Sequence, residues 1–119
     1  MTSWDAPRFT CDYSQPASYR FSLDSILLAK AAHRDLALGL LPVPERTLDL
    51  CAGAGVVGLE LAHLNPDVRD IDFVEVQPSY RDHFLINQKL AQPLNITTQW
   101  IESNYRDLHP CETYDLIVC

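Results

Sequence analysis

The chain has 119 residues, of which 47% are hydrophobic, and its formal charge at pH 7 is −7. This length allows one domain at most, and the apolar content is that of a globular chain, which excludes a disordered one. The acidic balance gives no electrostatic footprint for nucleic acid, although a basic patch on other parts of a protein would supply one. No apolar run approaches the length of a membrane span, so no membrane association is expected.

The four cysteines and four histidines form no ligand pattern. Cys11, Cys51, Cys111 and Cys119 include no C-x-x-C pair, and the first residues lack a secretory signal pattern, so a reducing cytoplasm is the expected location. The histidines lack metal-ligand spacing, and no metal site is predicted. No base adjoins Cys51, so a role as a nucleophile is not expected.

The chain begins with an irregular arm, residues 1–22, and residues 23–119 then alternate helix and strand patterns. A first helix is predicted to begin after Ser22 as its N-cap and to end near Gly39 as its C-cap. The expected strands are residues 47–50, 71–76, 96–101 and 114–118. The later helices are residues 56–65 and 78–93. This alternation predicts an α/β fold with a Rossmann-like, doubly wound parallel sheet.

A glycine-rich turn links the first predicted strand to the second predicted helix. Gly53, Gly55 and Gly58 fit G-x-G-x-x-G, in which glycines allow a tight turn, close approach of a ligand and close helix packing. The free N–H groups of the new helix point at whatever occupies the turn. Glu75 follows about 20 residues later, where a ribose-binding acid is expected. A nicotinamide dinucleotide is therefore one candidate ligand.

An acid inside the first strand favours a second candidate. The stretch 49–55, DLCAGAG, resembles motif I (D-x-G-x-G-x-G) of the class I S-adenosylmethionine-dependent methyltransferases, with a cysteine where the first glycine usually stands. The resemblance implies that S-adenosylmethionine is the cofactor and that its amino-acid part lies beside this turn. Asp49 would hold the turn, or a water near the cofactor ammonium group. The resemblance also implies that the cofactor contacts the residues of the turn, which are Cys51, Ala52, Gly53, Ala54 and Gly55.

Polar residues at three strand ends complete the predicted site. In open parallel sheets the ligand lies outside the carboxyl ends of the strands, and Asp49, Glu75 and Asn104 all fall there. The carboxylate of Glu75 offers two acceptors to a pair of ribose hydroxyls, and Val76 would line the adenine pocket. By the same resemblance, Asn104 would accept a hydrogen bond from the adenine amino group, and Tyr105 would pack near the ring.

The segment before the first strand supports a narrower resemblance. The stretch YRFSLDSILLA resembles the F-x-x-D-x-x-L-L segment of bacterial tRNA (adenine-N6) methyltransferases, and Glu75–Pro78 and Asn87 point the same way. The resemblance covers about residues 19–118. It implies that Arg20 and Asp24 lie over the methionine end of the cofactor, and that the complete enzyme acts on tRNA.

That family places N-P-P-Y directly after the fourth strand, whereas this chain stops at Cys119, one residue after the run Asp115–Val118. We therefore expect no catalytic residue within the chain, which corresponds to the N-terminal portion of a methyltransferase domain and is inactive by itself. The edge of the fourth strand would then be exposed and would favour pairing with a second copy as a homodimer.

Three alternatives stay open. The first is a release-factor glutamine N-methyltransferase, because there too a nitrogen of the substrate, that of a side-chain amide, attacks the methyl group. An NAD-dependent oxidoreductase fits the glycines, although a complete helix before the first strand is atypical of a dinucleotide fold. A non-catalytic fragment that binds the cofactor without turnover fits the same residues.

Overall fold

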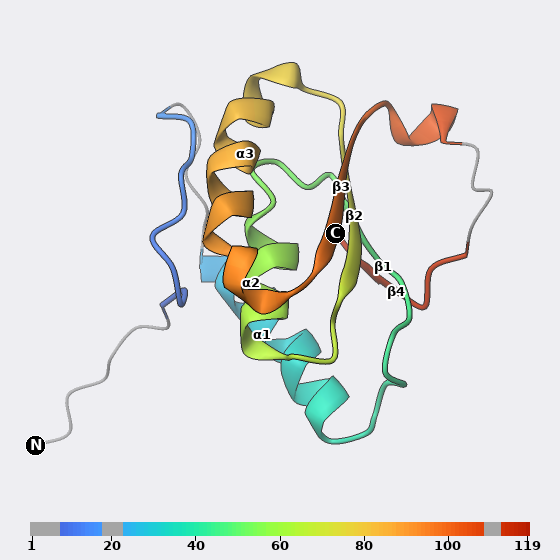
Figure 1. The fold of residues 1–119 in the computed structure, drawn as a ribbon. Helices are drawn as coiled ribbons and strands as arrows, with labels where there is room; N and C mark the ends of the chain where they lie inside the picture. Colours follow the sequence, from blue (N-terminus) through green and yellow to red (C-terminus); the bar gives the residue numbers. More distant parts are fainter. Residues whose placement is uncertain (1–7, 18–22, 109–112) are drawn as a thin grey trace, which may run out of the picture.

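A computed structural model describes residues 8–17, 23–108 and 113–119. Within these residues three α-helices and four strands follow one another along the chain (Figure 1). The helices are α1 (Leu23–Ala37), α2 (Val56–Leu64) and α3 (Arg81–Leu90), and the strands are β1 (Thr47–Leu50), β2 (Asp70–Glu75), β3 (Thr97–Glu102) and β4 (Leu116–Val118). The short 3-10 turns are η1 (Pro78–Tyr80), η2 (Gln92–Leu94) and η3 (Tyr105–Asp107).

The four strands form one parallel sheet in the order β3-β2-β1-β4. The chain steps outward from β1 through β2 to β3, and then returns to the opposite side of β1. The predicted α/β fold with a Rossmann-like parallel sheet is therefore confirmed. The switch in direction lies between β1 and β4, where Asp49 pairs with Val118. Ligands of such sheets bind at this switch point.

The helices cover one face of the sheet. In Figure 1, α1, α2 and α3 lie together on one side of the strands, and η3 lies on the other side. Aromatic rings join the two layers, because Phe84 of α3 packs against Phe73 of β2 and Trp100 of β3 with ring centroids 4.8 Å apart in both pairs. The helix α2 is apolar around most of its circumference and is the most deeply buried. Its burial fixes the turn that precedes it against the sheet.

The cap of α1 agrees with the sequence prediction. Gly39 has a φ of 73°, and the N–H of Leu40 donates to the carbonyl of Asp35 at 2.9 Å, which is the bond pattern of a Schellman C-cap. The predicted N-cap, Ser22, lies outside the described residues.

The prolines limit the third helix more than predicted. Pro78 lies in the 3-10 turn η1 and the α-helix begins only at Arg81, while Pro93 lies in η2, after the helix has ended at Leu90. A proline has no N–H for the bond to the preceding turn, so it is tolerated at these entry and exit turns but not within the helix.

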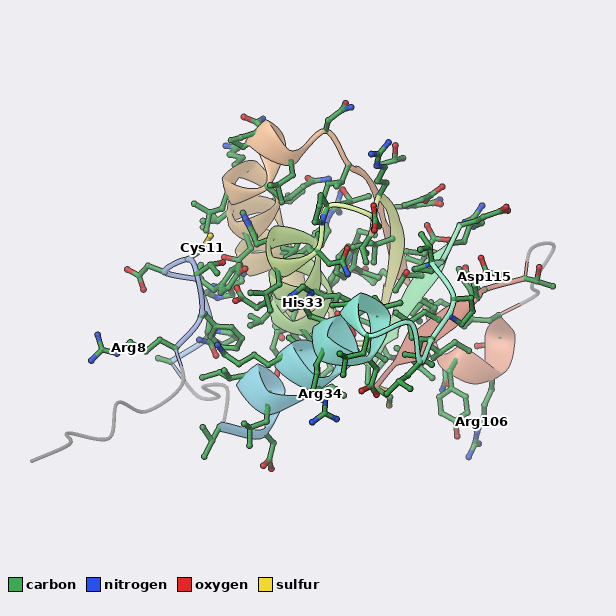
Figure 2. All side chains as sticks on the ribbon, turned by 90° about the horizontal axis from the view of Figure 1, so that it is seen from below. Arg8, Cys11, His33, Arg34, Arg106 and Asp115 are labelled. Carbon is green, nitrogen blue, oxygen red and sulfur yellow. The ribbon has the colours of Figure 1, made fainter. Side chains whose placement is uncertain are left out.

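Residues 10–16, which we call the strap, have no regular secondary structure but pack against α2 and α3. Tyr13 belongs to the hydrophobic core and is only 6% exposed. Figure 2 shows Cys11 turned toward the helices and Arg8 pointing away from them. The domain boundary at residue 22 stays a prediction.

None of the described helices combines the length and the hydropathy that crossing a lipid bilayer requires. Among the described strands, none pairs with the outer edge of β4, where Ile117 is 57% exposed. A homodimer through this edge stays a prediction.

Candidate cofactor site

Close packing fixes the glycine-rich turn between β1 and α2. A Cβ atom at Gly58 would lie 2.7 Å from Cε1 of Phe73 and 3.0 Å from Oδ2 of Asp49. Gly55 has a φ of 80°, and a Cβ atom there would lie 2.7 Å from Cδ2 of Phe84. Only glycine fits at these two positions, because the turn and the start of α2 touch the sheet and α3.

Asp49 ties the end of β1 to the first turn of α2. Its side chain is buried at 3% exposure, and Oδ2 accepts a hydrogen bond from the N–H of Gly58 at 3.0 Å. Burial raises the pKa of this carboxyl to about 7; the Gly58 bond opposes the rise and nearby Glu75 adds to it. Asp49 therefore holds the turn, as the sequence suggested, and is only partly ionised near neutral pH.

We expect Asp49→Asn to remove a loss of stability that the wild-type chain shows with rising pH. The carboxyl has a pKa of about 7 in the folded state and about 3.9 in an unfolded chain. Its contribution to stability is therefore fully present below about pH 4 and is lost as the pH rises to about 7. Asparagine stays neutral and can still accept from Gly58. Urea denaturation measures the free energy of unfolding of both chains. Between about pH 4 and pH 8, the difference in this free energy should grow in favour of the variant by on the order of a few kcal/mol. A constant difference would contradict this expectation.

Glu75, at the carboxyl end of β2, joins two backbone segments. Its Oε1 accepts from the N–H of Gly53 at 2.8 Å, and its Oε2 accepts from the N–H of Gln77 at 2.9 Å. A carboxylate has about four lone-pair positions, so each oxygen keeps one for a further donor. The side chain is held rigidly, with acceptor capacity left for the predicted ribose hydroxyls.

Two cavities meet at Cys51 and Glu75. The larger has a volume of about 400 Å³ and lies over the glycine-rich turn, between the strap, α1 and the ends of β1 and β4. Predicted site residues that line it are Asp24, Asp49, Cys51, Ala52, Gly53, Ala54 and Glu75. The smaller, about 180 Å³, lies between the ends of β2 and β3 and is lined by the predicted residues Cys51, Glu75, Val76, Asn104 and Tyr105. Gly55 lines neither cavity, because it faces Phe84.

The remaining predicted residues differ in how the structure places them. Arg20 lies outside the described residues. Asn104 Oδ1 accepts a hydrogen bond from the N–H of Arg106 at 3.0 Å and so forms a local turn, while its adenine contact stays a prediction. Tyr105 is 57% exposed, with the guanidinium carbon of Arg106 5.9 Å from its ring centroid. Figure 2 shows Arg106 pointing away from the fold.

Several residues that line the larger cavity were not among the predicted site residues. The ring of Tyr80 packs on the glycine-rich turn, with Cε1 3.5 Å from the position of a Cβ on Gly53. Gln15 and Pro16 bring the strap into the cavity wall. The sequence held one signal for the docked strap: Glu60 is an acid in the mostly apolar helix α2, and a buried acid requires polar partners. The other missed lining residues are Ser25, Leu28, Val56, Val57 and Cys119.

Cys51 adopts a backbone conformation that normally calls for glycine. Its φ is 57°, in the left-handed region, where most L-residues pay about 1–2 kcal/mol. This is the position at which the resembled motif has its first glycine. Cys51 is exposed, but partial desolvation raises the pKa of its thiol, and the neighbouring Cys119 adds to the rise.

Replacing Cys51 by glycine should therefore stabilise the chain by about 0.5–1 kcal/mol, since relief of the left-handed strain exceeds the extra entropy of glycine in the unfolded state. Asn95→Gly is the matched control. Asn95 has a φ of 54°, but asparagine tolerates this region, so the change should be smaller. Urea denaturation measures both, and a less stable Cys51→Gly chain would contradict the strain argument.

No protein-family profile matches this sequence, and no curated protein matches it significantly. Solved structures do match its architecture. PH1948 from Pyrococcus horikoshii, described as a candidate RNA methyltransferase, has a TM-score of 0.61 and 18% identity over 80% of this chain and 42% of its own. The plantazolicin methyltransferase BpumL, in complex with SAH (S-adenosylhomocysteine), has a TM-score of 0.61 and 18% identity over 79% of this chain and 34% of its own.

This chain shares the α/β fold of these two methyltransferases. Coclaurine N-methyltransferase, bound to N-methylheliamine and SAH, shares it with a TM-score of 0.58 and 20% identity over 90% of this chain and 30% of its own. The chain spans less than half the length of each of these three proteins. Within this shared fold, the larger cavity opens at the switch point of the sheet, beside the ends of β1 and β4.

Proposed function

We propose that this chain binds S-adenosylmethionine and forms the cofactor-binding part of a methyltransferase. The charge of the larger cavity carries this proposal. Asp24, Asp49 and Glu75 line it, whereas none of its described lining residues is a lysine, arginine or histidine. S-adenosylmethionine carries a positive sulfonium, a positive ammonium and one carboxylate, and is positive overall, while NAD carries two negative phosphates and one positive nicotinamide ring, and is negative overall. Carboxylates attract the first ligand and repel the second.

The two cavities divide the cofactor between them in this proposal. The methionine part lies over the glycine-rich turn near Asp24 and Asp49, the ribose lies at Glu75, and the adenine lies beside Val76 and Asn104. When bound, the cofactor supplies an activated methyl group. The residues of this chain bind and orient it, which is the positioning that such transfer depends on.

Calorimetric titration of the chain with SAH, with NAD as the control, tests the cofactor. Binding of SAH without binding of NAD is the expected result. Binding of NAD alone would replace the proposal with the oxidoreductase alternative. Binding of neither ligand would contradict a preformed site in these 119 residues.

We further propose adenine N6 of tRNA as the methyl acceptor, with the chain by itself binding the cofactor without turnover. The support is the resemblance of residues 19–118 to the tRNA (adenine-N6) methyltransferases. Deletion of the encoding gene, followed by mass spectrometry of tRNA nucleosides, tests the acceptor. Loss of N6-methyladenosine from tRNA is expected. Unchanged tRNA with loss of methylglutamine from release factors would favour the glutamine methyltransferase.

A further inference from the structure

Two fully buried polar side chains hold the strap in place, and the first is Glu60 of α2. Its carboxylate accepts from the N–H of Thr10 at 3.0 and 3.1 Å, from the Thr10 hydroxyl at 2.8 Å and from the Tyr13 hydroxyl at 2.9 Å. A buried carboxylate without such donors would be strongly unfavourable. Glu60 therefore anchors the N-terminal half of the strap to the helix that follows the glycine-rich turn.

The second is Asn87 of α3, and it makes contacts on two sides. Its Oδ1 accepts from the N–H of Ser14 at 2.7 Å, and its Nδ2 donates to the carbonyl of Ser14 at 2.9 Å and to the carbonyl of Ala54 at 3.0 Å. Both amide hydrogens are thus used, and the side chain is 0% exposed. A contact of 2.7 Å between the Ser14 hydroxyl and Nδ1 of His83 adds a further link to α3.

These contacts reach two walls of the larger cavity. Ala54 belongs to the glycine-rich turn, and the strap residues that follow Ser14, Gln15 and Pro16, line the same cavity. Asn87 lines neither cavity itself. One buried amide therefore connects the strap wall to the turn wall without touching the space between them.

We propose that Asn87 is a positioning residue of the cofactor cavity, which sets the strap against the glycine-rich turn so that docking of the strap and binding of the cofactor stabilise each other. The proposal rests on the proposed function, because the ligand is S-adenosylmethionine or its product. A ligand that contacts both walls favours the docked strap by the same factor by which the docked strap favours the ligand.

The test removes hydrogen bonds of Asn87 by substitution either in α3 or in the strap, and it measures two quantities. Asn87→Ala removes all three hydrogen bonds, and Ser14→Pro removes the N–H that Oδ1 accepts. The affinity for SAH, measured by calorimetry, should fall about tenfold or more in each variant, the equivalent of one or two lost hydrogen bonds. The double variant should lose no more affinity for SAH than the weaker-binding single variant, because both substitutions break the same contact between Asn87 and Ser14.

Hydrogen exchange of residues 8–17 separates positioning from a general loss of stability. In the wild-type chain, saturating SAH should slow exchange in this segment. In both variants this protection should be lost while the far-UV circular dichroism stays that of the wild type. Gln88→Ala is the control, because Gln88 is the next residue of α3 and donates to Oγ1 of Thr98 at 2.6 Å, away from the strap. It should keep both the affinity and the protection.

Wild-type affinity in Asn87→Ala, or ligand-dependent protection of the strap that survives in it, would overturn the proposal. If Asn87→Ala does not fold, Ser14→Pro decides by the same two measurements. Failure of the wild-type chain to bind SAH would overturn the proposed function and this inference together, whereas binding by wild type with unaffected variants would overturn this inference only.

Discussion

Replacing Gly55 by alanine is expected to destabilise the chain by about 2–5 kcal/mol and to abolish binding of SAH. Two costs add at this position. The φ of 80° costs an L-residue about 1–2 kcal/mol, and a Cβ atom 2.7 Å from Cδ2 of Phe84 overpacks the core at a cost of about 1–3 kcal/mol. Relief of the clash would move the turn that bears Gly53 and Ala54. Urea denaturation and calorimetric titration measure the two effects.

Gly39→Ala is the matched control for this substitution. Gly39 also has a positive φ, 73°, but a Cβ atom there would meet nothing within 4 Å. It should therefore show only the backbone cost, about 1–2 kcal/mol, and leave SAH binding unchanged. Equal losses of stability in the two variants would mean that contact with Phe84 contributes nothing.

Replacing Glu75 by glutamine is expected to weaken SAH binding by at least about 100-fold. Hydrogen bonds to a charged carboxylate are worth about 1.5–3 kcal/mol each, and an amide nitrogen cannot accept from a ribose hydroxyl. The same amide nitrogen would also face the N–H of Gly53 or of Gln77, where Glu75 now accepts. Calorimetric titration of the variant gives the loss directly.

Glu102→Gln provides the control, because Glu102 pairs with Glu75 across β2 and β3 and is exposed. Its substitution changes the charge of the same sheet edge by the same amount but touches neither cavity. Its affinity for SAH should equal that of the wild-type chain. An affinity of Glu75→Gln within about threefold of wild type would contradict the assignment of Glu75 to the ribose.

The parts of the site that the sequence predicted depend on local patterns. The run that includes Asp49 reads as a strand and a turn within a few residues, and Glu75 and Asn104 each follow an apolar run. Parallel pairing then brings the carboxyl ends of these strands to one edge without further information. Most of the predicted residues accordingly line the two cavities.

The parts that the sequence did not predict depend on contacts between distant residues. Thr10 and Glu60 are 50 positions apart, and Ser14 and Asn87 are 73 positions apart. No periodicity links such pairs, so the sequence predicted only an irregular arm where the strap lies. Gly55 was predicted to contact the cofactor but lines neither cavity, for a similar reason. The ring of Phe84 occupies its open side, and Phe84 comes from α3, distant in the sequence.

Nuclear magnetic resonance of the ¹⁵N-labelled chain during titration with SAH tests the placement of the cofactor most directly. We predict the largest shifts at the amides of Gly53 and Gln77, which donate to Glu75 between the two cavities. The amides of Gln88 and Gln92, which border a separate groove of about 310 Å³, should stay unchanged. Shifts at that groove, with Gly53 and Gln77 unaffected, would contradict the proposal that the two cavities beside Glu75 hold S-adenosylmethionine.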